Sequence, residues 1–116
     1  MNILDRQNYI SKTFKDVHKN IFDQIKMFED KSKIQDDVWH KKELGNGNSV
    51  VIDDGNFFDK AGINFSSISG KSLPESSVGN KSKSMGLPFF ATGVSVVFHP
   101  KNPYIPTAHL NVRYFC

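Results

Sequence analysis

The first part of the chain repeats apolar side chains every three or four positions. Between residues 4 and 29 the apolar residues are spaced 4, 3, 4, 4 and 3 apart. This spacing places them on one face of a helix. It predicts an amphipathic helix that packs on the remainder of the domain, with His18 beside the stripe and facing solvent. The stripe consists of Ile10, Phe14, Val17, Ile21, Ile25 and Phe28.

Beyond the helix the pattern changes to alternation of polar and apolar residues, which is typical of strands. Strands are predicted at residues 36–43, 49–52, 63–69, 88–99 and 107–115. Gly45-Asn46-Gly47-Asn48 predicts a hairpin turn, and Phe57 to Gly62 an irregular or helical turn. Residues 70–86, rich in Ser, Lys, Gly and Asn, predict a flexible loop. The whole order predicts an α+β fold, with the N-terminal helix packed on an antiparallel meander sheet.

The last two predicted strands show the clearest division into one polar and one apolar face. His109, Asn111 and Arg113 alternate with apolar residues, so all three lie on one face of a strand. Ser95, Val97 and His99 alternate in the same way in the preceding strand, and a linker with three prolines separates the two. We expect an antiparallel hairpin with one polar and one apolar face. The predicted register pairs His99 with His109, Val97 with Asn111 and Ser95 with Arg113.

This polar face suggests chemistry, with alternatives that the residues leave open. The Arg113 guanidinium suits a bidentate carboxylate, or an ion pair with an acid elsewhere in the chain. Asn111 can orient the same ligand, and His109 can transfer a proton. His99 and His109 can serve as metal ligands. Two ligands do not make a site, however, and a hydrogen-bonded structural role is the alternative for each histidine.

Composition limits the classes of function. The chain has 116 residues, which suits one domain, and a net charge of +3 without a dense basic stripe, so nucleic-acid binding is not expected. The single cysteine excludes an internal disulfide and fits the cytoplasm. No apolar run is long enough to span a membrane. The chain stops within a predicted strand, so we expect residues 1–116 to be a truncated, N-terminal portion of a longer protein.

Two blocks of sequence resemble a known family. Residues 58–66, FDKAGINFS, are similar to the FEKAGVNFS block of oxygen-dependent coproporphyrinogen III oxidases. Residues 88–115, from PFFATGVSVVFHP to AHLNVRYF, look like the signature of that family almost without gaps. Trp39 and the region 45–52 also fit. The resemblance implies a large flat antiparallel sheet flanked by helices, in a homodimer. Ser67 and Ser69 depart from the histidine that some members carry after this first block.

The resemblance also implies an activity and residue roles. The family converts coproporphyrinogen III to protoporphyrinogen IX in heme biosynthesis, by oxidative decarboxylation of two propionates to vinyl groups with O2. No organic cofactor is expected, although a divalent metal has been proposed. The implied roles are substrate contact for Ser95, Asn111, Val112 and Arg113, proton donation for His109, and metal ligation for His99 and His109. The alternatives are a catalytically inactive fragment that binds a tetrapyrrole or metal without turnover, and a small interaction module.

Overall fold

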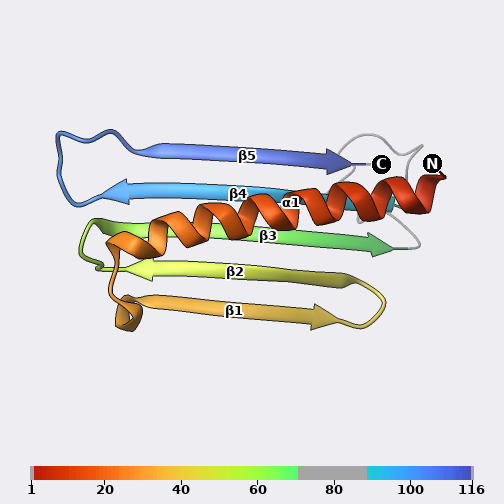
Figure 1. Ribbon diagram of the computed structural model, residues 1–116, viewed down its shortest axis with the longest axis horizontal. Helices are drawn as coiled ribbons and strands as arrows, with labels where there is room; N and C mark the ends of the chain where they lie inside the picture. The colour runs from red at the N-terminus through yellow and green to blue at the C-terminus, as the bar shows by residue number, and fades with distance from the viewer. Residues whose placement is uncertain (1, 71–88, 116) are drawn as a thin grey trace, which may run out of the picture.

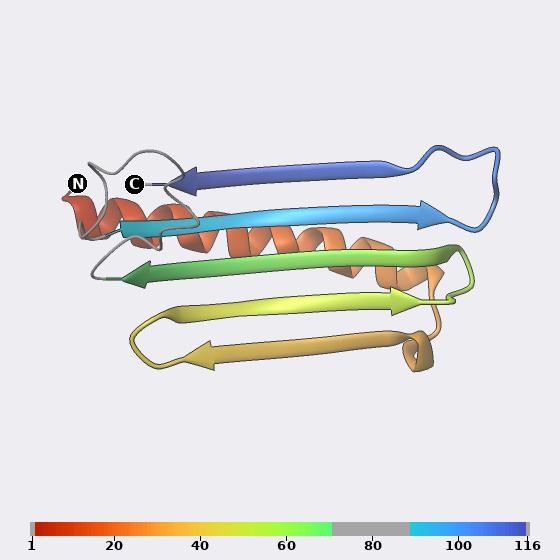
Figure 2. The same ribbon diagram turned by 180° about the vertical axis from the view of Figure 1, so that it is seen from behind.

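One long helix lies across one face of a five-stranded sheet in the computed structural model, which describes residues 2–70 and 89–115 (Figure 1). The strands lie side by side in chain order, each antiparallel to the next, so the sheet is a simple meander (Figure 2). The predicted α+β class and antiparallel meander are confirmed. The elements are α1 (Ile3–Ile25), β1 (Ile34–Lys41), β2 (Gly45–Asp53), β3 (Phe58–Gly70), β4 (Phe89–Pro100) and β5 (Ala108–Phe115).

The helix starts at a capped turn and ends earlier than the sequence predicts. The Asn2 side chain accepts a hydrogen bond from the Asp5 backbone N–H at 2.8 Å, which satisfies one free donor at the helix start. The α-helix ends at Ile25, and two short 3-10 turns follow at Lys26–Phe28 and Lys31–Lys33. The predicted end near residue 29 is therefore too late by about one turn.

The buried face of α1 differs from the predicted stripe at two positions. Phe28 lies beyond the helix in a 3-10 turn and is 59% exposed, so its predicted burial is wrong. Phe14, Ile21 and Ile25 pack on the core as predicted, but Val17 is 39% exposed. His18 is buried instead, and its Nε2–H donates a hydrogen bond to the Ile63 carbonyl oxygen at 2.9 Å. The prediction that His18 faces solvent is wrong. A buried imidazole is tolerated here because its N–H group has a partner.

The hydrophobic core lies between α1 and the three central strands. The helix packs mainly on β3 and β4. Alternate residues of β2, β3 and β4 point toward it, and their burial follows the two-residue period of a strand. Phe58 and Phe98 extend the core, with ring centroids 5.1 Å apart. The core side chains that are at most 3% exposed are Val50, Ile52, Ile63, Phe65, Val94 and Val96.

A buried carboxylate fastens the end of the helical region to the β2–β3 turn. Glu29 is 8% exposed and accepts hydrogen bonds from the backbone N–H groups of Asn56, Phe57 and Phe58. A Cβ atom on Gly55 would collide with this carboxylate, so the turn needs glycine there. Three backbone donors and one carboxylate thus hold the two segments together.

Two predicted turns lie inside strands. Gly45 to Asn48 belong to β2, and the β1–β2 turn is formed by residues 42–44, with Glu43 at a φ of 69°. Gly47 instead lets the Trp39 ring lie close to the backbone of β2, because a Cβ on Gly47 would collide with that ring. The turn predicted at Phe57 to Gly62 is also wrong, since β3 begins at Phe58. The predicted loop 70–86 lies outside the described residues, except Gly70, which ends β3.

The predicted β4–β5 register is wrong by two residues. Val97, rather than His99, lies opposite His109, and Ser95 lies opposite Asn111. Because the error is an even number of residues, every side chain stays on its predicted face. The alternation of polar and apolar residues is satisfied by either register, so the pattern in the sequence could not distinguish the two.

Candidate functional site on the uncovered sheet face

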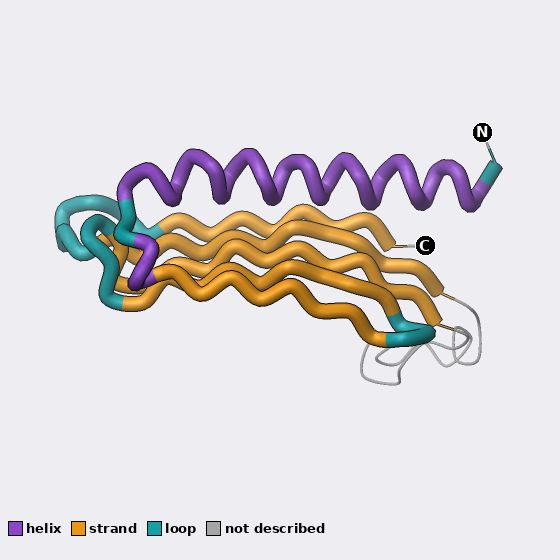
Figure 3. Tube along the Cα trace, turned by 60° about the horizontal axis from the view of Figure 1, so that its bottom comes forward, coloured by secondary structure: helices purple, strands orange, loops and turns teal. Residues whose placement is uncertain are grey.

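The strands expose a second face on the side away from α1, which we call the open face. Figure 3 shows α1 along one side of the sheet and no described helix along the other. Residues of β2, β3 and β4 that alternate with the core residues point to the open face. Among the described residues it is therefore a broad sheet surface that no described helix covers.

The polar trio of β5 lies on the open face. His109, Asn111 and Arg113 are exposed and alternate with Leu110 and Val112, which lie on the side of α1. Ser95 lies directly opposite Asn111, so a hydroxyl group and an amide group are cross-strand neighbours in the β4–β5 pair.

The side chain of Val112 lies on the opposite face of the sheet from the other predicted substrate-contacting residues. Its neighbours Asn111 and Arg113 point to the open face, whereas its own side chain, 42% exposed, points to the helix side opposite Val94. Only the main chain of Val112 can therefore take part in contacts on the open face.

Small residues are frequent at the centre of the open face. Arg113 pairs with Gly93 on β4, where a Cβ would collide with the main chain of Val112. At the other edge, the half-buried Trp39 ring lies against Gly47. Between these edges many of the side chains are small, which leaves room over the sheet for a broad, flat ligand. The small residues are Gly47, Ser49, Gly62, Ser66, Gly93 and Ser95.

The two histidines lie on the same face but not opposite each other. His99 follows Phe98, the last residue of β4 that pairs with β5, while His109 pairs with Val97. They are thus diagonal neighbours, about 7–8 Å apart between backbones. Among residues 2–70 and 89–115 there is no group of three or more His, Cys, Asp or Glu side chains that would hold a metal ion. The two imidazoles supply two of the roughly three or four ligands that a zinc site needs.

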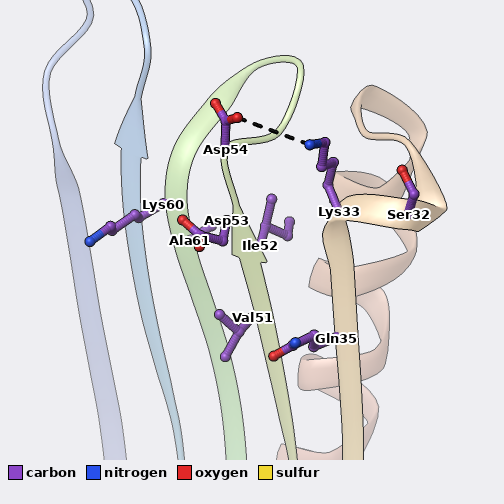
Figure 4. A pocket seen from close by; sticks show the side chains of 9 residues that line it. All are labelled: Ser32, Lys33, Gln35, Val51, Ile52, Asp53, Asp54, Lys60 and Ala61. Carbon is purple, nitrogen blue, oxygen red and sulfur yellow. Dashed lines mark ion pairs between the residues drawn. The ribbon is translucent and has the colours of Figure 1, made fainter.

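A hollow lies near the β2–β3 turn (Figure 4). None of the predicted site residues lines it, although Lys60 at its edge pairs with His99. Asp54 is at its rim, 4.0 Å from the Lys33 ammonium. Lys101 donates a hydrogen bond to Asp54 at 2.7 Å and lowers the pKa of that carboxyl below its ordinary value, with a smaller contribution from Lys33. The Asp54 carboxylate is thus already paired with the ammonium groups of Lys101 and Lys33, so it offers little charge to a ligand. The lining residues are Ser32, Lys33, Gln35, Val51, Ile52, Asp53, Asp54, Lys60 and Ala61.

Sequence reasoning missed two polar residues of the open face. Ser49 on β2 and Asn64 on β3 lie opposite each other, and Asn64 lies opposite Ser95 on its other side. The alternation of residues 63–69 was a usable signal for Asn64, because it separates Asn64 from the apolar Ile63 and Phe65. The sequence pattern alone does not show that Ser49 and Asn64 lie on the same face as the polar residues of β5, because this depends on the strand order and register.

Comparison with known proteins shows which family the chain resembles. A family model described as coproporphyrinogen III oxidase matches residues 9–116. Two proteins named oxygen-dependent coproporphyrinogen-III oxidase are similar to the chain. The one from Prochlorococcus marinus strain MIT 9515 is 45% identical over 96 residues, which cover 83% of this chain and 28% of that protein. The one from strain AS9601 is 49% identical over 85 residues, 73% of this chain and 25% of that protein.

The matched part is thus only about a quarter of each relative's length. In the described part of the chain, no helix has both the length and the apolar character needed to cross a membrane. The match to the family model nevertheless includes all five strands and every residue of the polar trio. The chain therefore belongs to the coproporphyrinogen III oxidase family.

Proposed function

We propose that the open face forms part of the substrate site of an oxygen-dependent coproporphyrinogen III oxidase. The observation that carries this proposal is the placement of His109, Asn111 and Arg113 side by side on an uncovered sheet face, next to the small residues of that face. The names of the relatives supply the substrate and the oxidant. A tetrapyrrole is broad, and its propionates are the kind of group that a guanidinium binds.

Each residue then has a chemical task. Arg113 binds a propionate through charge-assisted hydrogen bonds, and Asn111 and Ser95 fix its orientation. In the reaction, one propionic acid side chain and O2 give a vinyl group, CO2 and H2O2. The side chain loses CO2 and one carbon-bound hydrogen with its electron pair, and that hydrogen and the carboxyl proton leave with the reduced O2 as H2O2. His109 is the group placed to transfer a proton during this step, because imidazole is the side chain most often used for that purpose.

A divalent metal on His99 and His109 remains a separate proposal. The two imidazoles share a face, but the described residues bring no third ligand to them. We therefore derive no step through a metal. Homodimer formation and a cytoplasmic location likewise remain predictions from the family resemblance.

Binding without turnover is the alternative for these 116 residues by themselves. It is favoured by one observation, that the chain matches only 28% of the length of a named relative. An aerobic assay with coproporphyrinogen III distinguishes the two, with protoporphyrin fluorescence read after oxidation of the product. Turnover supports the enzyme, and saturable binding without turnover supports the alternative. In a protein of the relatives' length, His109→Ala should lower turnover by about 100-fold or more and leave binding unchanged.

Arg113→Ala tests the substrate site directly. Titration of the chain with coproporphyrin III, the stable oxidised form of the substrate, should show binding weakened at least about tenfold, because a charge-assisted hydrogen bond is lost. Arg6→Ala is the matched control, since it removes the chain's only other arginine, which is exposed on α1. Equal affinity of Arg113→Ala and wild type would contradict the proposed site.

A further inference from the structure

A row of polar side chains crosses the open face through all five strands. Its members are direct cross-strand neighbours, because the register pairs each of them with the next. Three of the five are not among the residues that the family resemblance implies. The row consists of Asp37, Ser49, Asn64, Ser95 and Asn111.

One hydrogen bond orients the amide in the middle of this row. The Ser49 hydroxyl donates to Oδ1 of Asn64 at 2.7 Å. The amide oxygen is thereby used, and the Nδ2 group with its two N–H donors points elsewhere on the exposed face. Nδ2 lies 3.9 Å from the position that a Cβ on Gly62 would occupy. Asn64 is exposed, and its same-face neighbour Gly62 carries no side chain, so Gly62 places no side chain against Nδ2.

This donor lies two strands away from the polar residues of β5. Asn64 and Asn111 are two strands apart, which corresponds to roughly 10 Å at the usual strand spacing. A carboxylate held by Arg113 and Asn111 over β5 therefore lies two strands away from Asn64 on β3. A tetrapyrrole that carries several propionates around a broad ring can present another carboxylate at that distance.

We propose that Asn64 is a further substrate-binding residue, which donates from its amide nitrogen to a second propionate of the tetrapyrrole. Ser49 is a positioning residue that acts through Asn64, because its hydroxyl holds the amide with nitrogen toward the ligand. This assignment rests on the proposed function of the open face. It gives the substrate a contact on β3 in addition to those on β4 and β5, and so sets how the ring lies across the sheet.

The test compares binding of coproporphyrin III by wild type, Asn64→Ala and Asn64→Asp. Asn64→Ala should weaken binding about three- to tenfold, the effect of one hydrogen bond. Asn64→Asp should weaken it more, because a nearly isosteric carboxylate would then oppose the propionate. Asn64 is exposed, so both variants should keep the urea midpoint of wild type. Asn20→Ala, which removes an exposed asparagine from α1, is the matched control.

The role of Ser49 needs a readout that packing alone would not change. Ser49→Ala should weaken binding about twofold, since the amide loses its orientation but keeps its donors. Ser49→Thr retains the hydroxyl and should restore the affinity of wild type. With coproporphyrin tetramethyl ester, which has no free carboxylate, wild type and the Asn64 variants should bind equally.

The outcomes separate the two proposals. If Arg113→Ala weakens binding and both Asn64 variants bind like wild type, the assignment of Asn64 is overturned and the proposed function stands. If wild type shows no saturable binding, both are overturned. A loss of ester binding in the Asn64 variants equal to the loss for the free acid also overturns the assignment, because the effect would not involve a carboxylate.

Discussion

The two faces of the sheet are built from the same strands but have opposite characters. On β3, Ile63 is fully buried against α1, while its neighbour Asn64 is exposed on the open face. On β2, Val50 is fully buried and Val51 is 42% exposed. The comparison shows that the chain separates stability from chemistry by alternation alone, since one residue step moves a side chain from the core to the candidate site.

The separation has an energetic consequence. Full burial of a large aliphatic side chain contributes on the order of 1.5–3 kcal/mol, whereas substitutions at exposed positions usually change stability by less than about 0.5 kcal/mol. The open face can therefore use glycine, serine and asparagine, which bury little apolar area, because the α1 side supplies the core. Three predictions are ordered from the largest expected effect to the smallest. The first tests this division of the two faces, and the other two test the contacts that hold the β2–β3 turn.

Truncation of Ile63 should produce the largest effect. Ile63→Ala removes a buried side chain that packs beneath α1 and is expected to cost about 2–5 kcal/mol of unfolding free energy. Val51→Ala, on the open face of the adjacent strand, is the control and should cost far less. Urea unfolding followed by circular dichroism measures both. Equal losses for the two variants would show that the open face is also part of a core.

Removal of the Glu29 charge should have an intermediate effect. In Glu29→Gln one carboxylate oxygen becomes an NH2 group, which opposes a backbone N–H donor of the 56–58 turn. The expected cost is about 1–3 kcal/mol. Amide hydrogen exchange should become faster at Asn56, Phe57 and Phe58. Unchanged exchange there would mean that Glu29 does not hold the turn to the end of the helical region.

The Asp54–Lys101 pair should produce the smallest effect. Lys101 lowers the pKa of the Asp54 carboxyl from 3.8, so the pair stabilises the fold above that value, and the contribution is lost as pH falls through the lowered pKa. Asp54→Asn keeps the shape and tolerates the φ of 52°. Its urea midpoint should be slightly below wild type at pH 7, and the difference should disappear at low pH. A difference that grows on acidification would contradict this.

Much of the local structure was predictable, and the errors have identifiable causes. The alternation in residues 93–99 and 108–114 correctly predicts which side chains share a face, even though the register was wrong by two. The glycines at 45 and 47 predict a turn because turn and close-approach glycines look the same in a sequence; the Trp39 ring against Gly47 distinguishes them. Val17 was predicted to be buried because it is apolar and has the helical spacing, whereas the neighbouring His18 is polar. In the structure His18 is the buried residue of the two.

By itself the sequence determined the helix and most of the strands, the alternation of faces and, through the signature in residues 88–115, the family. These depend on local periodicity and residue identity, which are readable in one dimension. The sequence did not determine the helix end or the structure at residues 45–48 and 57–62, where it predicts turns. The burial of His18, the Glu29 contacts and the row from Asp37 to Asn111 were decided only by the tertiary structure. Each depends on which residues far apart in the chain become neighbours, and that follows from the order and register of strands packed together against one helix.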